Sequence, residues 1–174
     1  YVGLRYPESY DPHVPASLVY SGKHKLTETT IGSSDLSSFG LDLGRFVLSP
    51  TRTYAPVMLA LKKAGLDQHV HGAIHCSGGG QTKALNFLRG VSVVKDDLFH
   101  PTPLLFRLIQ EESGTPLKEM YQAFNMGHRL ELYIPPDQAV QKEIIAIANH
   151  YGIKAKEVGR CEPAKTESVV IKTH

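Results

Sequence analysis

Two periods of hydrophobic residues run through this chain, and together they predict strands alternating with helices. Apolar residues occupy every second position of 70–74 and of 130–134, which is the period of a strand. Val140, Ile144, Ile147 and Tyr151 recur on one stripe, which is typical of an amphipathic helix. The same patterns predict further helices at 54–64, 84–90, 103–113 and 116–124 and further strands at 46–48, 91–94, 153–158 and 168–172. We therefore expect an α/β (α+β) fold of packed layers with a mixed sheet.

The start of the chain does not follow these periods. Residues 1–45 contain several prolines and glycines and only short apolar patches, so we expect an irregular arm or linker that packs on the surface of a domain formed by residues 46–174. A chain of 174 residues with 41% hydrophobic residues is long enough to bury a core without disulfides. Because Tyr1 is not an initiator methionine, we expect the chain to be a piece of a longer polypeptide.

Charge and cysteine content narrow the possible partners. The formal net charge is +2, and the 19 lysines and arginines are scattered, which argues against a nucleic-acid partner. No apolar run approaches the roughly 18 residues of a membrane span, so we expect no membrane association. Cys76 and Cys161 are the two cysteines of the sequence, too few for a disulfide framework, and we interpret them as reduced thiols of a cytoplasmic protein.

The most informative stretch is His75-Cys76-Ser77-Gly78-Gly79-Gly80-Gln81-Thr82-Lys83, here called the glycine loop. It follows a predicted strand and precedes a predicted helix, a layout that offers backbone N–H groups and a helix N-terminus to an anion. We expect the triglycine amides to be unpaired. The spacing is neither that of a P-loop nor that of the dinucleotide fingerprint. A glycine-rich turn that only eases packing fits the loop equally well.

Other polar groups offer weaker signals. Arg52 lies where a strand would pass into a helix and could bind a phosphate or carboxylate, although an ordinary surface arginine is as good an interpretation. Asn125 begins a turn, Asn125-Met126-Gly127-His128-Arg129, whose simpler interpretation is a helix stop in left-handed geometry. His69, His71 and His75 fall on one side of a predicted strand, but the sequence contains no second motif of paired metal ligands, so we predict no metal site. Asp96-Asp97 could hold magnesium, but a solvated acidic turn is the simpler interpretation.

Three segments together identify a resemblance. Ser49-Pro50-Thr51-Arg52-Thr53-Tyr54, Ala73-Ile74-His75-Cys76-Ser77-Gly78-Gly79-Gly80 and Glu119-Met120-Tyr121-Gln122-Ala123-Phe124-Asn125-Met126-Gly127 occur in this order. The sequence from Phe46 to about Gly159 resembles the C-terminal half of the phosphoribosylformylglycinamidine cyclo-ligase (AIR synthase) family. It departs from the family after the triple glycine, where Gln81-Thr82-Lys83 intervenes, and after Phe-Asn-x-Gly, where His128-Arg129 replaces small or apolar residues.

The resemblance implies a C-terminal domain with α/β/α layering, partly like a ferredoxin fold, in a two-domain enzyme of purine biosynthesis. It implies ATP and magnesium, bound mainly by an N-terminal ATP-binding domain of the same polypeptide that also builds a homodimer, and a ribonucleotide substrate. The domain alone would be inactive. Alternatives are another ATP-dependent relative, such as formylglycinamidine ribonucleotide synthetase or a selenophosphate or thiamine-phosphate enzyme, or a non-catalytic module that binds a phosphorylated metabolite.

Within this resemblance we assign expected roles to particular residues. The glycine loop from Ser77 to Thr82 would bind a phosphate, Arg52 and Lys83 would neutralise its charge, and Asn125 would orient a substrate amide. His75 would shape the loop or assist proton transfer. The predicted set is therefore His75 as the catalytic residue and Arg52, Ser77, Gly78, Gly79, Gly80, Thr82, Lys83 and Asn125 as binding residues.

Overall fold

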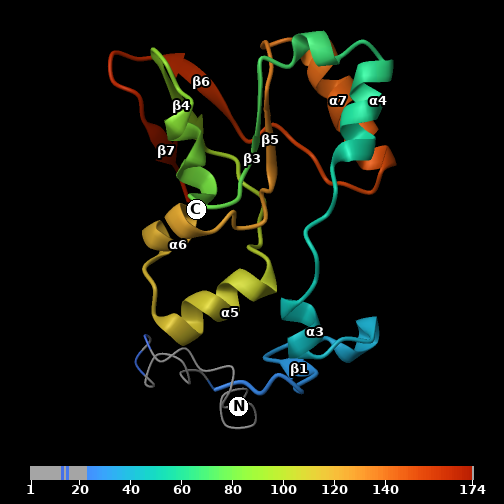
Figure 1. The fold of residues 1–174 in the computed structure, drawn as a ribbon, viewed down its shortest axis with the longest axis vertical. Helices are drawn as coiled ribbons and strands as arrows, with labels where there is room; N and C mark the ends of the chain where they lie inside the picture. The colour runs from blue at the N-terminus through green and yellow to red at the C-terminus, as the bar shows by residue number, and fades with distance from the viewer. Residues whose placement is uncertain (1–12, 14, 16–22, 174) are drawn as a thin grey trace. The chain divides into compact units, whose positions relative to one another are not determined.

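The computed structural model describes residues 13, 15 and 23–173 of the chain (Figure 1). Contacts group the chain into two compact units: one combines residues 1–51 with Leu104–Pro116, and the other combines Arg52–Pro103 with Leu117–His174. The predicted arm, residues 1–45, falls within the first unit, and residues 1–12, 14 and 16–22 of it lie outside the described part. All the predicted site residues belong to the second unit.

The first unit is small. Strands β1 (Thr30–Ile31) and β2 (Ser34–Asp35) pair antiparallel, followed by the 3₁₀ helix η2 (Ser37–Phe39), the helix α3 (Leu43–Val47) and, from later in the chain, α5 (Leu104–Ser113). Ile31, Leu36, Leu43 and Leu108 form its buried core. The predicted strand at 46–48 was wrong, because the Asp42 carboxylate accepts a hydrogen bond from the Arg45 N–H at 2.8 Å and starts a helix there.

The second unit contains two sheets. Strands β3 (Gly72–His75) and β5 (Leu130–Tyr133) pair antiparallel, with Ile74 opposite Glu131. Strand β4 (Val91–Lys95) is antiparallel to β6 (Gly159–Pro163) and parallel to β7 (Val169–Ile171), so the predicted mixed sheet is confirmed. The remaining elements are the helices α4 (Ala55–Lys63), α6 (Leu117–Ala123) and α7 (Gln138–His150) and the 3₁₀ helices η3 (Asp67–His69) and η4 (Gly80–Asn86).

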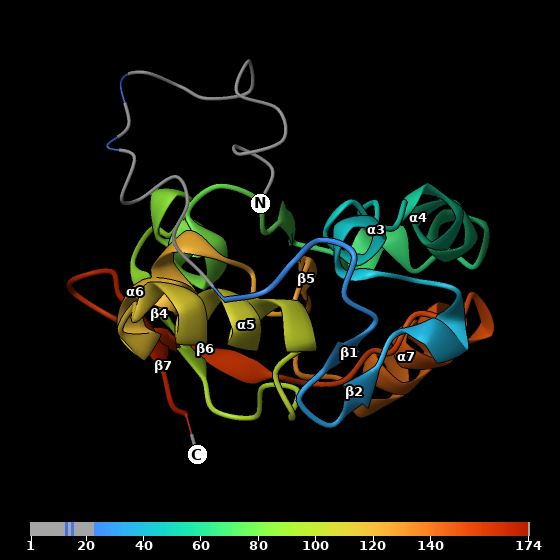
Figure 2. The same cartoon turned by 90° about the horizontal axis from the view of Figure 1, so that it is seen from below.

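The strands β3 and β5 lie between helices on one side and the second sheet on the other (Figures 1 and 2). On the helix side, α4 and α7 pack on each other and on Leu132 and Ile134 around a core of Val57, Leu61, Leu66, Val140, Ile144 and Ala148. On the other side, Ile74 and Cys76 pack with Ala84 of η4 and with Val169 of β7. The alternation of β5 places Glu131 and Tyr133 on the side opposite Leu132, as its sequence pattern predicts.

Two further expectations fail here. No strand forms at 153–158: Ile153 and Ala155 instead pack against the α4 and α7 core, and the next strand begins at Gly159. The helix predicted at 84–90 is the 3₁₀ helix η4, which begins earlier and ends at Asn86. Among the described residues, no helix is long and apolar enough to cross a membrane.

Candidate functional site

The glycine loop leaves β3 at the edge of the two-stranded sheet, as the sequence predicts. His75 pairs with Leu130 in the ladder, and the Cys76 N–H donates to the Arg129 carbonyl at 2.7 Å. Cys76 is buried, whereas Ser77 and the first two glycines after it are exposed. The chain therefore emerges from the core between Cys76 and Ser77, and the loop begins on a rigid strand.

Backbone hydrogen bonds then turn the chain into η4. Gly79 and Gly80 take φ values of +89° and +49°, in the left-handed region that favours glycine. The Gly80 N–H donates to the Ser77 carbonyl and the Thr82 N–H to the Gly79 carbonyl, each at 3.0 Å. The expectation of unpaired triglycine amides was thus wrong for Gly80, because its N–H is hydrogen-bonded within the turn. No described residue accepts a hydrogen bond from the N–H of Gly78 or Gly79.

The three glycines have different surroundings. A Cβ at Gly80 would lie 2.4 Å from the Phe124 carbonyl oxygen and 2.7 Å from that of Tyr121, whereas a Cβ at Gly78 would meet nothing within 4 Å. Gly80 therefore permits the close packing of η4 on the end of α6. Gly78 and Gly79 are exposed and leave their amides open to an anion. The packing interpretation and the binding interpretation each apply to part of the loop.

A cation lies against this open part. The Lys83 ammonium donates to the Ser77 hydroxyl oxygen at 2.6 Å, and the Thr82 hydroxyl donates to the Gly79 carbonyl at 2.9 Å. Because η4 is a seven-residue 3₁₀ helix, its dipole is short, and the Lys83 charge and the Gly78 and Gly79 amides carry any attraction for an anion. The structure thus brings Ser77, the glycines, Thr82 and Lys83 together.

Tyr54 gathers a second group of predicted residues beside the end of β3. Its ring lies edge-on to the His75 ring with 6.1 Å between centroids. Burial raises the pKa of Tyr54, and the hydrogen-bonded Arg129 side chain and the charge of Arg52 act against that rise. The Arg52 guanidinium also donates to the Gly152 carbonyl at 2.6 Å, just after α7. Arg52 and Arg129 thus place two cations near Tyr54, and Arg129 is a residue that the predicted set does not contain.

Asn125 starts the turn that the sequence predicts. Its side-chain oxygen accepts from the Gly127 N–H at 2.9 Å, and Met126 takes a positive φ of 51°, as in the helix-stop interpretation. Its carbonyl accepts a 2.7 Å hydrogen bond from the Gln81 side chain. The turn that contains Asn125 is therefore attached directly to the glycine loop.

A buried polar network that the sequence did not indicate lies under the loop. Gln81, Lys95 and Glu131 are 0%, 2% and 8% exposed. The Lys95 ammonium pairs with the Glu131 carboxylate and donates to the main-chain and side-chain oxygens of Gln81, at 2.7 and 3.1 Å. The Tyr133 hydroxyl donates to the other Glu131 oxygen at 2.8 Å. The sequence shows a lysine at the end of one apolar strand and a glutamate within another, but nothing in it indicates that these two residues pair.

His128 is also buried, at 6% exposure. Its Nε2 accepts a hydrogen bond from the Phe99 N–H at 2.8 Å, so the neutral ring carries its proton on Nδ1. Burial lowers the pKa of His128 to about 4. His128, at which the sequence departs from the family pattern, is therefore a core residue whose ring holds the segment around Phe99.

Other candidates do not assemble into a site. His69 lies in η3, outside the strand that contains His75. Asp96 pairs with Arg160 at 2.5 Å and Asp97 with Lys156 at 2.6 Å, so this acidic turn is neutralised by cations. Among the described residues, no group of three or more His, Cys, Asp or Glu side chains is arranged to hold a metal ion.

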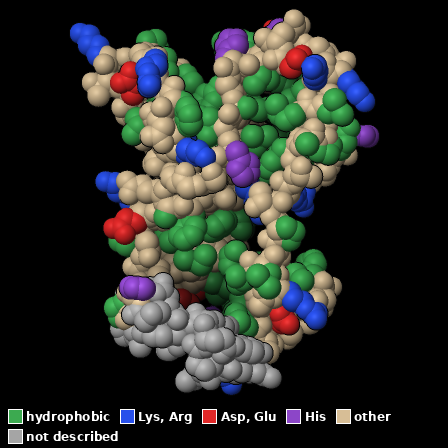
Figure 3. All heavy atoms as spheres, viewed as in Figure 1, with side chains coloured by type: hydrophobic (Ala, Val, Ile, Leu, Met, Phe, Trp, Pro, Cys, Tyr) green, Lys and Arg blue, Asp and Glu red, His purple; other side chains and the backbone are tan. Residues whose placement is uncertain are grey.

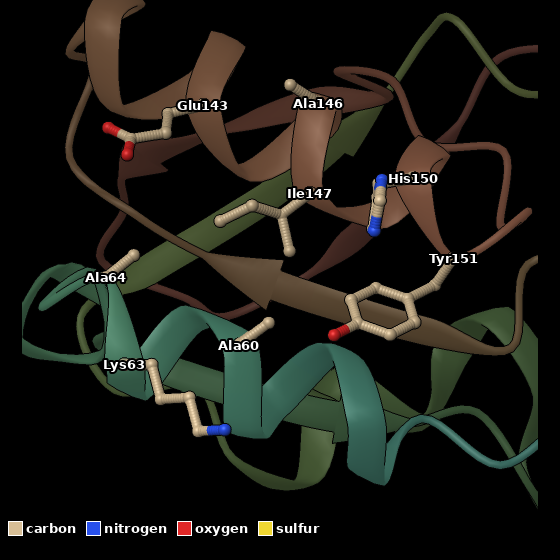
Figure 4. A pocket seen from close by; sticks show the side chains of 8 residues that line it. All are labelled: Ala60, Lys63, Ala64, Glu143, Ala146, Ile147, His150 and Tyr151. Carbon is tan, nitrogen blue, oxygen red and sulfur yellow. The ribbon is translucent and has the colours of Figure 1, made fainter.

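The second unit also has an open groove between α4 and α7. Ala60 from α4 and Ala64 just after it face Ile147 from α7, and the Tyr151 ring lies at one end (Figure 4). Hydrophobic side chains gather over these helices in the upper right of Figure 3. No predicted site residue lines the groove, so it is separate from the loop chemistry.

Comparison with known proteins decides the family. The family described as AIR synthase related protein, C-terminal domain, matches residues 19–172. The chain belongs to this family. It is 35% identical over 133 residues to a phosphoribosylformylglycinamidine cyclo-ligase of Enterococcus faecalis, covering 75% of this chain and 36% of the relative.

Other members of the AIR synthase related family show the same partial coverage. The cyclo-ligase of Methanopyrus kandleri is 35% identical over 127 residues, covering 72% of this chain and 34% of its own length. That of Shouchella clausii is 33% identical over 140 residues, covering 79% and 39%. The chain thus spans between a third and two fifths of the length of these relatives.

Proposed function

We propose that this chain is the C-terminal domain of an ATP-dependent cyclo-ligase of purine biosynthesis. The reaction converts formylglycinamidine ribonucleotide to aminoimidazole ribonucleotide and releases ADP and phosphate. The observation that carries the proposal is membership of the AIR synthase related family together with an exposed glycine loop whose cation, Lys83, lies beside it. The domain by itself is expected to be inactive.

In the proposed chemistry, ATP phosphorylates the formyl oxygen of the substrate, the ribose-bearing nitrogen attacks the activated carbon, and phosphate leaves as the ring closes. Such reactions depend mainly on positioning and on stabilising developing negative charge. Two exposed amides and an ammonium within one turn are suited to a phosphate group. This site therefore supplies charge stabilisation without a nucleophile of its own.

Each predicted residue has a place in this proposal. Gly78 and Gly79 donate their amides, and Ser77, Thr82 and Lys83 contact the same phosphate. Arg52 and Arg129 face a second negatively charged group near Tyr54. His75, which touches the Tyr54 ring, assists proton transfer or shapes the loop, and Asn125 uses its free side-chain NH₂ on a substrate carbonyl, since its oxygen is held by Gly127. Gly80 has a packing role.

The remaining partners follow from the same proposal. ATP and its magnesium are bound mainly by an N-terminal domain of the same polypeptide, since Asp96 and Asp97 are paired with cations and do not fit a magnesium site. The full-length enzyme is a homodimer built by that domain and works in the cytoplasm. Two alternatives are another ATP-dependent relative of the same superfamily and a module that binds a phosphorylated metabolite without catalysis.

The test uses the full-length protein, ATP and formylglycinamidine ribonucleotide. Phosphate release that requires both compounds, with aminoimidazole ribonucleotide detected by mass spectrometry, would support the proposal. Binding of both compounds in calorimetry without phosphate release would support the non-catalytic alternative and contradict ours. Phosphate release that requires glutamine, or selenide in place of the ribonucleotide, would favour another superfamily member.

A matched pair of lysine variants tests the loop itself. Lys83→Met removes the charge beside Ser77, and Lys62→Met removes an exposed charge in the last turn of α4. We expect Lys83→Met to lower kcat/KM by about 10–100-fold, the typical scale for losing one charged hydrogen bond to a phosphate. Lys62→Met should match wild type. Equal activity of the two variants would exclude the loop as the phosphate site.

A further inference from the structure

The buried network beneath the glycine loop joins the two segments that carry the predicted site residues. Gln81 lies in the loop, and its side-chain NH₂ donates to the carbonyls of Asn125 and His128, at 2.7 and 3.0 Å. Both acceptors belong to the turn after α6. One side chain therefore links the phosphate-binding loop to the turn that contains Asn125, across 44 positions of sequence.

Gln81 is itself held from below. Lys95, at the end of β4, donates to both oxygens of Gln81, one on the main chain and one on the side chain. The main-chain bond holds the loop backbone, and the side-chain bond orients the amide so that its NH₂ points at the turn. The Lys95 charge is balanced by Glu131 on β5. Strands of both sheets thus contribute to holding one residue of the loop.

The cost of this arrangement indicates that it does more than fill the core. Taking a lysine and a glutamate out of water is expensive, and well-packed apolar residues often replace such a pair without loss of stability. Gln81, Lys95 and Glu131 are all more than nine-tenths buried. In this pair, Lys95 donates to both the main-chain and the side-chain oxygen of Gln81, so these bonds constrain the loop backbone and the direction of the Gln81 amide.

We infer that Gln81, Lys95 and Glu131 are positioning residues that set the distance and orientation of the glycine loop relative to the Asn125 turn. This inference rests on the proposed function, in which the loop and the turn contact one substrate. None of the three residues touches the substrate. They act by keeping the Gly78 and Gly79 amides and the Asn125 side chain in a single arrangement, since displacements of about 1 Å can cost a hundredfold in rate.

The central test is the double variant Lys95→Met/Glu131→Gln in the full-length protein. Each single variant leaves an unpaired buried charge and should melt at a much lower temperature. The double variant has no buried charge, and the introduced glutamine still accepts from Tyr133, so we expect its melting temperature to return close to that of wild type. Its KM for the ribonucleotide should nevertheless rise at least tenfold, because both hydrogen bonds that Lys95 donates to Gln81 are gone.

A second variant avoids the charges altogether. Gln81→Met keeps the Lys95–Glu131 pair and removes the link to the Asn125 turn, and we expect the same rise in KM at near-normal melting temperature. Lys156→Met, which breaks an exposed ion pair with Asp97, is the matched control and should behave as wild type. Wild-type KM and kcat in both Gln81→Met and the double variant would overturn the inference.

Amide hydrogen exchange separates this inference from the proposed function. In wild type, the amides of residues 80–83 should exchange slowly, and in Gln81→Met and the double variant they should exchange at least tenfold faster at unchanged global stability. If the wild-type protein has no cyclo-ligase activity, the proposed function fails, but faster exchange would still support the positioning role. Unchanged exchange in both variants would refute it, whatever the activity.

Discussion

Replacing Gly80 by alanine should destabilise the second unit far more than the same change at Gly78 or Gly79. Gly80 has a φ of +49°, and an added Cβ would lie 2.4 and 2.7 Å from the carbonyl oxygens of Phe124 and Tyr121. Both carbonyl oxygens belong to the backbone at the end of α6, which cannot rotate away as a side chain does. Relief requires η4 or the end of α6 to move.

Two costs add at this position. An alanine in left-handed geometry costs about 1–2 kcal/mol, and forcing extra volume into a packed site costs about 1–3 kcal/mol. We therefore expect Gly80→Ala to lower the free energy of unfolding by about 2–5 kcal/mol. Gly79→Ala has only the backbone cost, about 1–2 kcal/mol, since its Cβ would meet Lys83 at an ordinary 3.5 Å. Gly78→Ala meets no atom within 4 Å and should be neutral or slightly stabilising.

Urea unfolding of the three variants in the full-length protein, followed by circular dichroism, measures this series. The expected order of midpoints is Gly78→Ala, then Gly79→Ala, then Gly80→Ala. Activity should follow a different order, because Gly78→Ala adds a methyl group beside the open amides and should weaken substrate binding while the fold is intact. A Gly80→Ala protein as stable as Gly78→Ala would refute the packing argument for Gly80.

Three other predictions concern the same unit. Burial lowers the pKa of His128 from 6.5 to about 4, so the unfolded chain takes up a proton before the folded chain does, and up to about 3 kcal/mol of the free energy of unfolding that is present above pH 6.5 is lost as the pH falls towards 4. His128→Gln can still accept the hydrogen bond from the Phe99 N–H, so its urea midpoint should change less with pH across this range. A pH dependence equal to that of wild type would contradict the assignment. Asp137→Ala removes the hydrogen bonds from Ala139 and Val140 at the start of α7 and should cost about 1 kcal/mol, largely restored in Asp137→Asn, as thermal unfolding will measure. Burial raises the pKa of the Cys76 thiol to about 12, so iodoacetamide at about pH 7.5 should modify exposed Cys161 and spare Cys76 in mass spectrometry of the native protein; equal labelling would show that Cys76 is accessible.

Secondary structure with a strong period was predictable from local sequence. The α7 stripe, capped by Asp137 and ended before Gly152, and the alternation in β5 each specify one element over many residues. Short patterns were ambiguous. The three apolar residues at 46–48 fit a strand or a helix, and the Asp42 cap decided for a helix. The alternation at 153–158 reflects packing against α4 and α7, where apolar residues are also required without strand pairing.

The candidate site was predictable in part for the same reason. The residues of the loop are close together in the sequence and therefore also in space, and the Lys83 ammonium donates a hydrogen bond to the Ser77 hydroxyl. Arg129 and Tyr54 are far apart in the sequence, and their contact joins the residue that precedes β5 to the residue that precedes α4. The three glycines look alike in sequence, and only the position of α6 distinguishes Gly80 from the other two.

The sequence by itself determined the family, through three separated motifs, and the place of the loop after a strand, through local periodicity. The tertiary structure decided which amides stay open and which polar residues are buried. Gln81, Lys95 and Glu131 are each ordinary in sequence and become one network because β4 and β5 belong to different sheets that meet beneath η4. Burial and pairing are properties of contacts between distant segments, and a local pattern does not specify them.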